Sequence, residues 1–255
     1  MRTVTLSVFQ EDYEFHDTDR VEFPMFDESF IVERLGPSSL RFVRKSGEQV
    51  RADSIISVDV RRAAFTFDPR LLDRPVILSF NARVIVHPKT SVSLYLLVPL
   101  DLSLVLKSNG ERIPVGNMIG EDFLTSCFGP PEFGQVCYIY YSEVLWKETE
   151  LGEASSFFAV VPLTIDNVSR GSVEVAKIIL EPWLLDLFEH DGRIYTSAVQ
   201  FRVVSRHSGT LIYRKAPPHS GDRPLMCSRT RPPKSWKERL LPWTARRRGI
   251  HYFKD

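Results

Sequence analysis

Two short clusters of histidine and carboxylate residues contain the side-chain types that ligate metals. One is His16-Asp17-Thr18-Asp19, with Glu14 just before it, and the other is Glu189-His190-Asp191. A metal site would need further His or carboxylate ligands that only the fold could bring together. The simpler interpretation is a polar loop for the first cluster and a hairpin turn for the second. We therefore expect no metal site and no cofactor.

The sequence contains no recognisable motif for nucleophilic catalysis or phosphate binding. It has no Gly-x-Ser-x-Gly elbow and no glycine-rich loop of the Walker or Rossmann type. Cys127 and Cys137 lie among aromatic residues, which suits inert thiols, and Cys227 makes the total odd. We expect free thiols in a reducing compartment and no catalytic residue. Two carboxylates that meet in space could still cleave a glycoside, so a hydrolase of unknown substrate is one alternative.

The C-terminal segment has the composition of a binding element. Residues 225–255 contain nine Lys or Arg against two acidic residues, whereas the rest of the chain holds 24 basic and 30 acidic side chains. An acidic body with a basic tail is typical of binding to phosphates, anionic lipid or an acidic partner. The expected partner-binding residues are Arg229, Arg231, Lys234, Trp236, Lys237, Arg239, Trp243, Arg246, Arg247 and Arg248.

Three interpretations of this tail stay open. Tryptophans beside clustered Arg and Lys suit a membrane interface, where rings lie at headgroup level and cations meet anionic lipid. Trp236, Trp243 and Phe253 could instead fold back onto the body and cover a sheet face. Nucleic acid is less favoured as the partner, because the body is acidic and nothing resembles a base-reading fold.

The most regular pattern in the chain is an alternation over Ser91–Leu106. Every even position from Val92 to Leu106 is apolar, so these side chains share one face of an extended strand. Pro99 donates no ladder hydrogen bond and should bend or divide this strand. Similar alternations occur over residues 76–86 and 157–165.

Turn residues separate the alternating runs. Asn109-Gly110 and Asp191-Gly192 predict hairpins, because Asn, Asp and Gly tolerate the positive φ of a type I′ turn. Short strands with frequent turns and almost no helical periodicity predict an all-β fold of one or two β-sandwich (immunoglobulin-like) domains with a short basic C-terminal tail. Helix is expected only in short pieces near residues 119–127, 181–188 and 234–241.

The expected domain organisation has three parts. An N-terminal β-sandwich covers residues 1–118, and a second β-sandwich covers residues 119–216. Residues 217–255 form a linker, indicated by the five prolines between Pro217 and Pro233, followed by the basic tail.

Three motifs follow the strand that contains Pro99. They are Phe128-Gly129-Pro130-Pro131, the aromatic run Gly134–Tyr140, and Ile165-Asp166-Asn167. In this order of strand, Gly-Pro turn, aromatic strand and Asn-containing turn, residues 75–215 resemble a family of uncharacterised, mainly archaeal proteins of unknown function. The resemblance supplies no catalytic residues. It implies a loose association with the genes of small-conductance mechanosensitive channels.

These observations favour a binding protein rather than an enzyme. The N-terminus lacks the apolar stretch of a signal peptide, and no window approaches the roughly 18 apolar residues of a membrane span. We expect a cytoplasmic binding or accessory module that can associate with a membrane and that regulates or docks onto a membrane protein such as a mechanosensitive channel. The alternatives are a nucleic-acid-associated protein that binds through the same tail and the hydrolase.

Overall fold

The structure is a computed structural model, and it describes most of the chain up to residue 225. The described residues are 2–3, 13–14, 20–25, 28–117, 124–128, 135–151, 157–205 and 208–225. They form β-strands almost throughout, with three single-turn 3-10 helices in the described ranges. The all-β fold class predicted from the alternating patterns is therefore confirmed.

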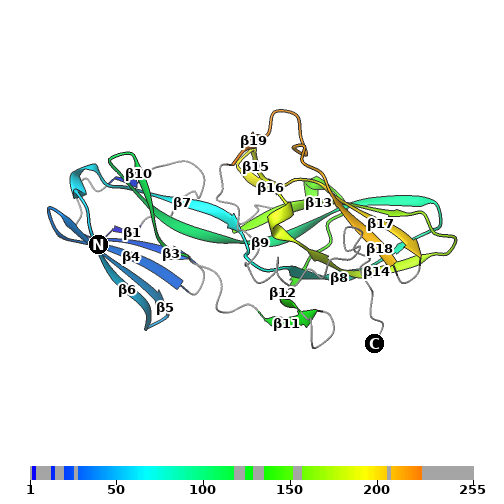
Figure 1. The fold of residues 1–255 in the computed structure, drawn as a ribbon, viewed down its shortest axis with the longest axis horizontal. Coiled ribbons are helices and arrows are strands. Elements are labelled where there is room, and N and C mark those ends of the chain that lie inside the picture. The colour runs from blue at the N-terminus through cyan, green and yellow to red at the C-terminus, as the bar shows by residue number, and fades with distance from the viewer. Residues whose placement is uncertain are drawn as a thin grey trace, which may run out of the picture. The chain divides into compact units, whose positions relative to one another are not determined.

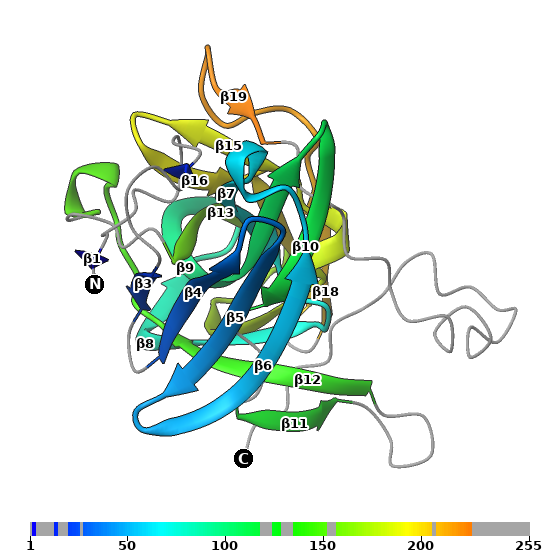
Figure 2. The ribbon, with the colours of Figure 1, turned by 90° about the vertical axis from the view of Figure 1, so that its left-hand side faces the viewer.

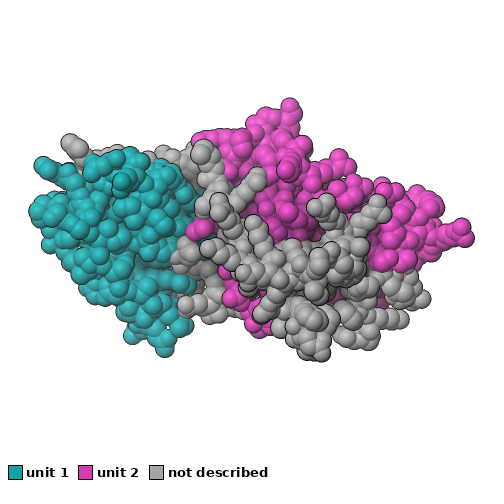
Figure 3. Space-filling view, in the orientation of Figure 1, with its two compact units in different colours: residues 1–69, 101–119 teal, residues 70–100, 120–255 magenta. Residues whose placement is uncertain are grey.

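The chain forms two compact units (Figure 3). Unit 1 contains Met1–Pro69 and Asp101–Ile119, and unit 2 contains Arg70–Leu100 and Gly120–Asp255. Strand β9 (Thr90–Ser108) runs through both, with its first half in unit 2 and its second half in unit 1. This division differs from the ranges expected from the sequence, because residues 70–100 pair with strands that come later in the chain.

Unit 1 contains a five-stranded sheet in the order β1-β3-β4-β5-β6. Figure 2 shows β4, β5 and β6 side by side. Strand β1 pairs with β3 in parallel, and the other neighbours are antiparallel. The strands are β1 (Arg2–Thr3), β3 (Arg20–Met25), β4 (Glu28–Gly36), β5 (Ser39–Ser46) and β6 (Gln49–Ser57).

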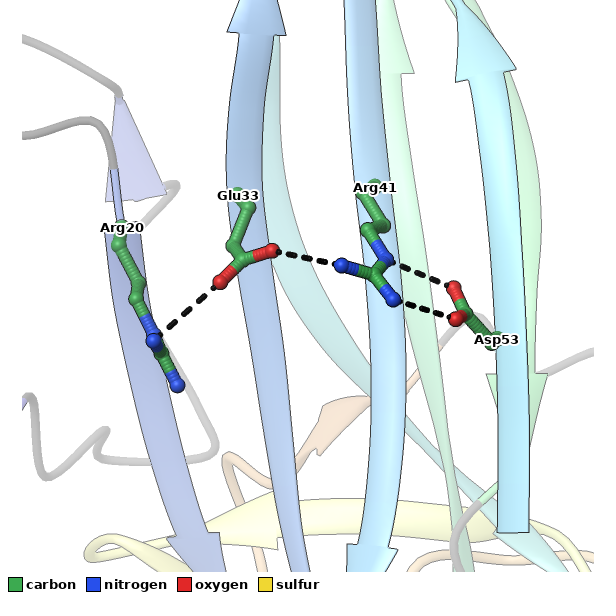
Figure 4. A network of polar contacts seen from close by, with 4 residues as sticks. All are labelled: Arg20, Glu33, Arg41 and Asp53. Carbon is green, nitrogen blue, oxygen red and sulfur yellow. Dashed lines mark hydrogen bonds and ion pairs between the residues drawn. The ribbon is translucent and has the colours of Figure 1, made fainter. Parts of the chain in front are cut away.

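A row of alternating charges crosses four strands of this sheet (Figure 4). Arg20 lies 3.3 Å from Glu33, and Arg41 lies 3.4 Å from the other oxygen of Glu33. Arg41 also donates two hydrogen bonds to Asp53, at 3.0 Å and 2.6 Å. These hydrogen bonds lower the pKa of the Asp53 carboxyl below its ordinary value. Because the side chains are partly exposed, we assign the row to strand register more than to stability.

The second layer of unit 1 consists of β7 (Ala64–Leu71), β10 (Glu111–Asn117), β2 (Tyr13–Glu14) and the second half of β9. The 3-10 helix η1 (Val60–Arg62) precedes β7. Phe23 of β3 meets Phe67 edge to face, and Phe42 of β5 meets Phe65 in the same way, with ring centroids 5.6 Å apart in both pairs. Because β7 carries Phe65 and Phe67, these contacts join the two layers into a sandwich.

Unit 2 contains a four-stranded sheet in the order β11-β12-β8-β14. Strand β8 lies parallel to β12 and antiparallel to β14. Its strands are β8 (Val76–Val86), β11 (Thr125–Phe128), β12 (Gln135–Ser142) and β14 (Val173–Leu180).

The second sheet of unit 2 is built around β13 (Phe158–Asn167), which pairs antiparallel with β9 and parallel with both β16 and β17 (Figure 1). Strands β8 and β13 are in contact, so unit 2 also has two layers. The remaining elements are β15 (Leu187–His190), β16 (Arg193–Thr196), β17 (Val199–Ser205), β18 (Ser208–Tyr213), β19 (Arg223–Pro224), η2 (Glu148–Glu150) and η3 (Pro182–Leu184).

The alternation in β9 corresponds to a buried face. Its even-numbered side chains from Leu94 to Leu106 are at most 1% exposed. Pro99 does not divide this strand, because β9 is continuous from Thr90 to Ser108. The ladder to β13 ends at the Pro99–Phe158 pair, so the missing N–H of the proline interrupts no further pairing with that strand.

Both hairpin predictions are confirmed. Asn109 and Gly110 have φ of 51° and 81° between β9 and β10, and Asp191 and Gly192 have φ of 48° and 74° between β15 and β16. The three helix predictions have different outcomes. In the range 119–127, residues 119–123 lie outside the described residues and residues 125–127 belong to strand β11. The single turn η3 lies within 181–188, and 234–241 lies outside the described residues.

A buried amide fixes the turn that follows β13. The Asn167 side chain is fully buried, and its Nδ2 donates hydrogen bonds to the carbonyl oxygens of Val86 at 2.9 Å, His87 at 3.2 Å and Gly171 at 2.8 Å. Its Oδ1 accepts hydrogen bonds from the backbone N–H and the hydroxyl of Ser169. One side chain therefore ties this turn to the end of β8.

Replacing Asn167 with alanine should lower the free energy of unfolding by about 3 kcal/mol, because buried carbonyl oxygens lose their donor. Urea denaturation of the full chain measures this change. Arg170→Ala, at an exposed position of the same turn, is the matched control and should leave the unfolding midpoint unchanged. Equal and small effects of the two substitutions would contradict the assigned role of the amide.

Candidate functional site

Five side chains of unit 2 form a compact polar group, which we call the histidine cluster. It consists of His190 at the end of β15, Tyr195 in β16, Glu148 in η2, and His219 and Asp222 in the segment that follows β18. Three stretches of the chain that lie far apart in sequence contribute to it. No other described group combines two histidines with two carboxylates in mutual contact.

Each histidine in the cluster faces a carboxylate. His190 Nδ1 lies 2.7 Å from Asp222 Oδ1, and the Asp222 side chain is completely buried. His219 Nε2 lies 3.2 Å from Glu148 Oε1. The two imidazole rings stack on each other, with centroids 4.6 Å apart and planes inclined by 23°. When either imidazole is protonated, it forms an ion pair with the carboxylate that it faces.

Tyr195 contacts both stacked rings edge to face and supplies a hydrogen-bond donor. Its hydroxyl donates a 2.6 Å hydrogen bond to Glu148 Oε1, the same oxygen that faces His219. Burial raises the pKa of Tyr195 to about 12, and the hydrogen bond and negative charge of Glu148 add to this effect while Arg193 opposes it. Burial, followed by the charge of Glu148, also raises the pKa of Tyr95. Tyr195 therefore stays neutral and keeps donating to Glu148 at physiological pH.

The hairpin between β15 and β16 positions one half of the cluster. Asp191 and Gly192 adopt the positive φ of its tight turn, which leaves His190 paired with Arg193 at the end of the ladder. Two residues further along β16 lies Tyr195, whose ring meets that of His190 edge to face at 6.1 Å. The turn residues that the sequence shows therefore set the spacing between two members of the cluster.

The other half belongs to residues 214–225, which we call the strap. Gly221 has a φ of 93°, a conformation that favours glycine, and it lets His219 N donate a 2.8 Å hydrogen bond to Asp222 Oδ2. Strand β19 then pairs with β15, and Leu225 N donates to Leu187 O at 2.9 Å. The strap is thus attached to unit 2 by backbone and side-chain contacts together.

The cluster contains groups that can bind and move protons. Imidazoles beside carboxylates can act as general acids and bases. Among the described residues, no group of three or more His, Cys, Asp or Glu could hold a metal ion. The clear structural consequence of the cluster is attachment of the strap.

A family described as "Protein of unknown function (DUF432)" matches residues 11–241 of the chain. The chain belongs to the DUF432 family. The match covers the histidine cluster, the strap and most of both units, and it is wider than the 75–215 region that carries the sequence resemblance. The expected membership of an uncharacterised family is thereby confirmed. Searches among curated proteins and among solved structures gave no match.

The DUF432 structure describes one of the two sequence clusters of histidine and carboxylate residues. Glu189-His190-Asp191 forms the end of β15 and its turn, as predicted, and His190 joins the histidine cluster. His16–Asp19 lies outside the described residues. So do all ten expected partner-binding residues, from Arg229 to Arg248, whose role stays a prediction.

Sequence reasoning missed four of the five members of the cluster in this DUF432 protein. Glu148, Tyr195, His219 and Asp222 belong to no motif, and the only local signal is the glycine placed between His219 and Asp222. The prolines of the strap indicate an extended linker, whereas residues 217–225 are attached to unit 2.

The aromatic residues of β12, together with Trp146 just after it, are partly buried and partly exposed. Tyr138 is buried, its hydroxyl donates to Asp73 at 3.1 Å, and Arg74 lies over its ring at 5.5 Å. Tyr141 and Trp146 are 70% and 47% exposed. Packing therefore accounts for only part of this run.

None of the helices in the described ranges is long and apolar enough to cross a bilayer.

Tyr195→Phe should lower the free energy of unfolding by about 1.5 kcal/mol at pH 7, because a hydrogen bond to a carboxylate is lost. A folded-state pKa raised to about 12 also means that the wild-type chain loses stability as the pH rises from about 10 through 12. The variant should lack the part of this loss that Tyr195 causes. Urea denaturation across pH 8–12 measures both effects, and parallel pH profiles of the two chains would contradict the assignment.

Asp222→Asn should loosen the strap without unfolding unit 2. Hydrogen exchange of the backbone amides of His219 and Leu225 should become at least tenfold faster, because the buried carboxylate no longer holds the strap. Asp191→Asn is the matched control, since Asp191 also faces His190, at 3.6 Å, but its side chain is 91% exposed. Equal exchange rates in both variants would show that Asp222 does not anchor the strap.

Proposed function

We propose that this DUF432 protein is a non-enzymatic binding module that docks onto an anionic partner through its basic tail, residues 226–255. The single observation that carries the proposal is the attachment of the strap, which ends one residue before the tail begins. Strand β19, the bond from Leu225 to Leu187 and the buried carboxylate of Asp222 all act within the last described residues. Docking of the tail would therefore localise unit 2 as well.

The distribution of charge supports an anionic partner. Residues 226–255 carry nine Lys or Arg and two acidic residues, whereas residues 1–225 carry 24 basic and 30 acidic side chains. An anionic surface attracts the tail and repels the rest of the chain, which favours an orientation with the tail toward the partner.

The proposed partner is a membrane protein, or the anionic lipid around it, on the cytoplasmic side. Trp236 and Trp243 among the basic residues suit the headgroup region of a bilayer. The resemblance to mainly archaeal proteins adds a small-conductance mechanosensitive channel as the first candidate to test. Nucleic acid is the second candidate, because the same charges would bind phosphates.

Removal of residues 226–255 should leave the body folded and abolish binding to the partner. This truncation keeps Leu225 and its bond to Leu187, so the strap should stay attached. Sedimentation with anionic vesicles, with vesicles that contain the channel, and with duplex DNA compares the full chain with the truncated one. Thermal unfolding of the truncated chain is the control for folding.

The substitution Arg246→Gln, Arg247→Gln and Arg248→Gln is a milder test of the same proposal. Each basic residue near an anionic leaflet contributes about 1 kcal/mol, so three should weaken vesicle binding roughly 100-fold at low salt. Lys89→Gln, Lys107→Gln and Lys147→Gln, which remove three charges from the body, form the matched control and should bind as the wild type does. Binding to DNA alone would favour the nucleic-acid function, and no binding by the full chain to any of the three would refute the proposal.

A further inference from the structure

We draw no further inference here: the strongest candidate, the exposed edge strand β6 of unit 1, carries Asp53 and a bulge at Arg51 that hinder the addition of another strand, and nothing in the described residues shows what would cover it.

Discussion

The buried face of β9 is the constraint on which both units depend. Its even-numbered side chains from Leu94 to Leu106 are almost inaccessible to solvent, although the strand runs from unit 2 into unit 1. Leaving one leucine of this face in water would cost about 2 kcal/mol. Each unit must therefore place a layer of side chains opposite its own half of the strand. The phenylalanines of β3 and β5 belong to the facing layer in unit 1, and the sheet that contains β8 forms the facing layer in unit 2.

Signals that act over a few residues predict much of this fold. The alternation identifies β8, β9 and β13, and the Asn-Gly and Asp-Gly pairs identify two hairpins, because strand periodicity and positive φ are local properties. Local reasoning does not decide whether Pro99 divides the strand, because the outcome depends on whether a neighbouring strand needs the missing N–H. It also does not show that β8 pairs with β12 and β14, since those pairings join residues far apart in sequence.

The histidine cluster shows the same limit more strongly. Glu148 and His219 are 71 residues apart in sequence, and their approach depends on β15 pairing with β19 and on the register of β15 against β16. Neither side chain stands in a motif. Asp222 resembles any turn residue in a Pro- and Gly-containing segment, yet the fold removes its carboxylate from solvent entirely. The sequence does predict one tight turn, Asp191-Gly192. This turn places His190 at the end of β15, the strand with which the strap pairs.

Attachment of the strap shortens the segment that connects the body to the proposed docking element. If residues 217–233 were all a free linker, these 17 residues could span up to about 55 Å when extended. Attachment as far as Leu225 leaves only residues 226–233, which span at most about 27 Å. A shorter free segment raises the effective concentration of the body at the partner's surface. If the tail binds a partner as proposed, that partner would lie close to the β15 edge of unit 2, and the histidine cluster, which holds the strap there, would help to set the position of the body.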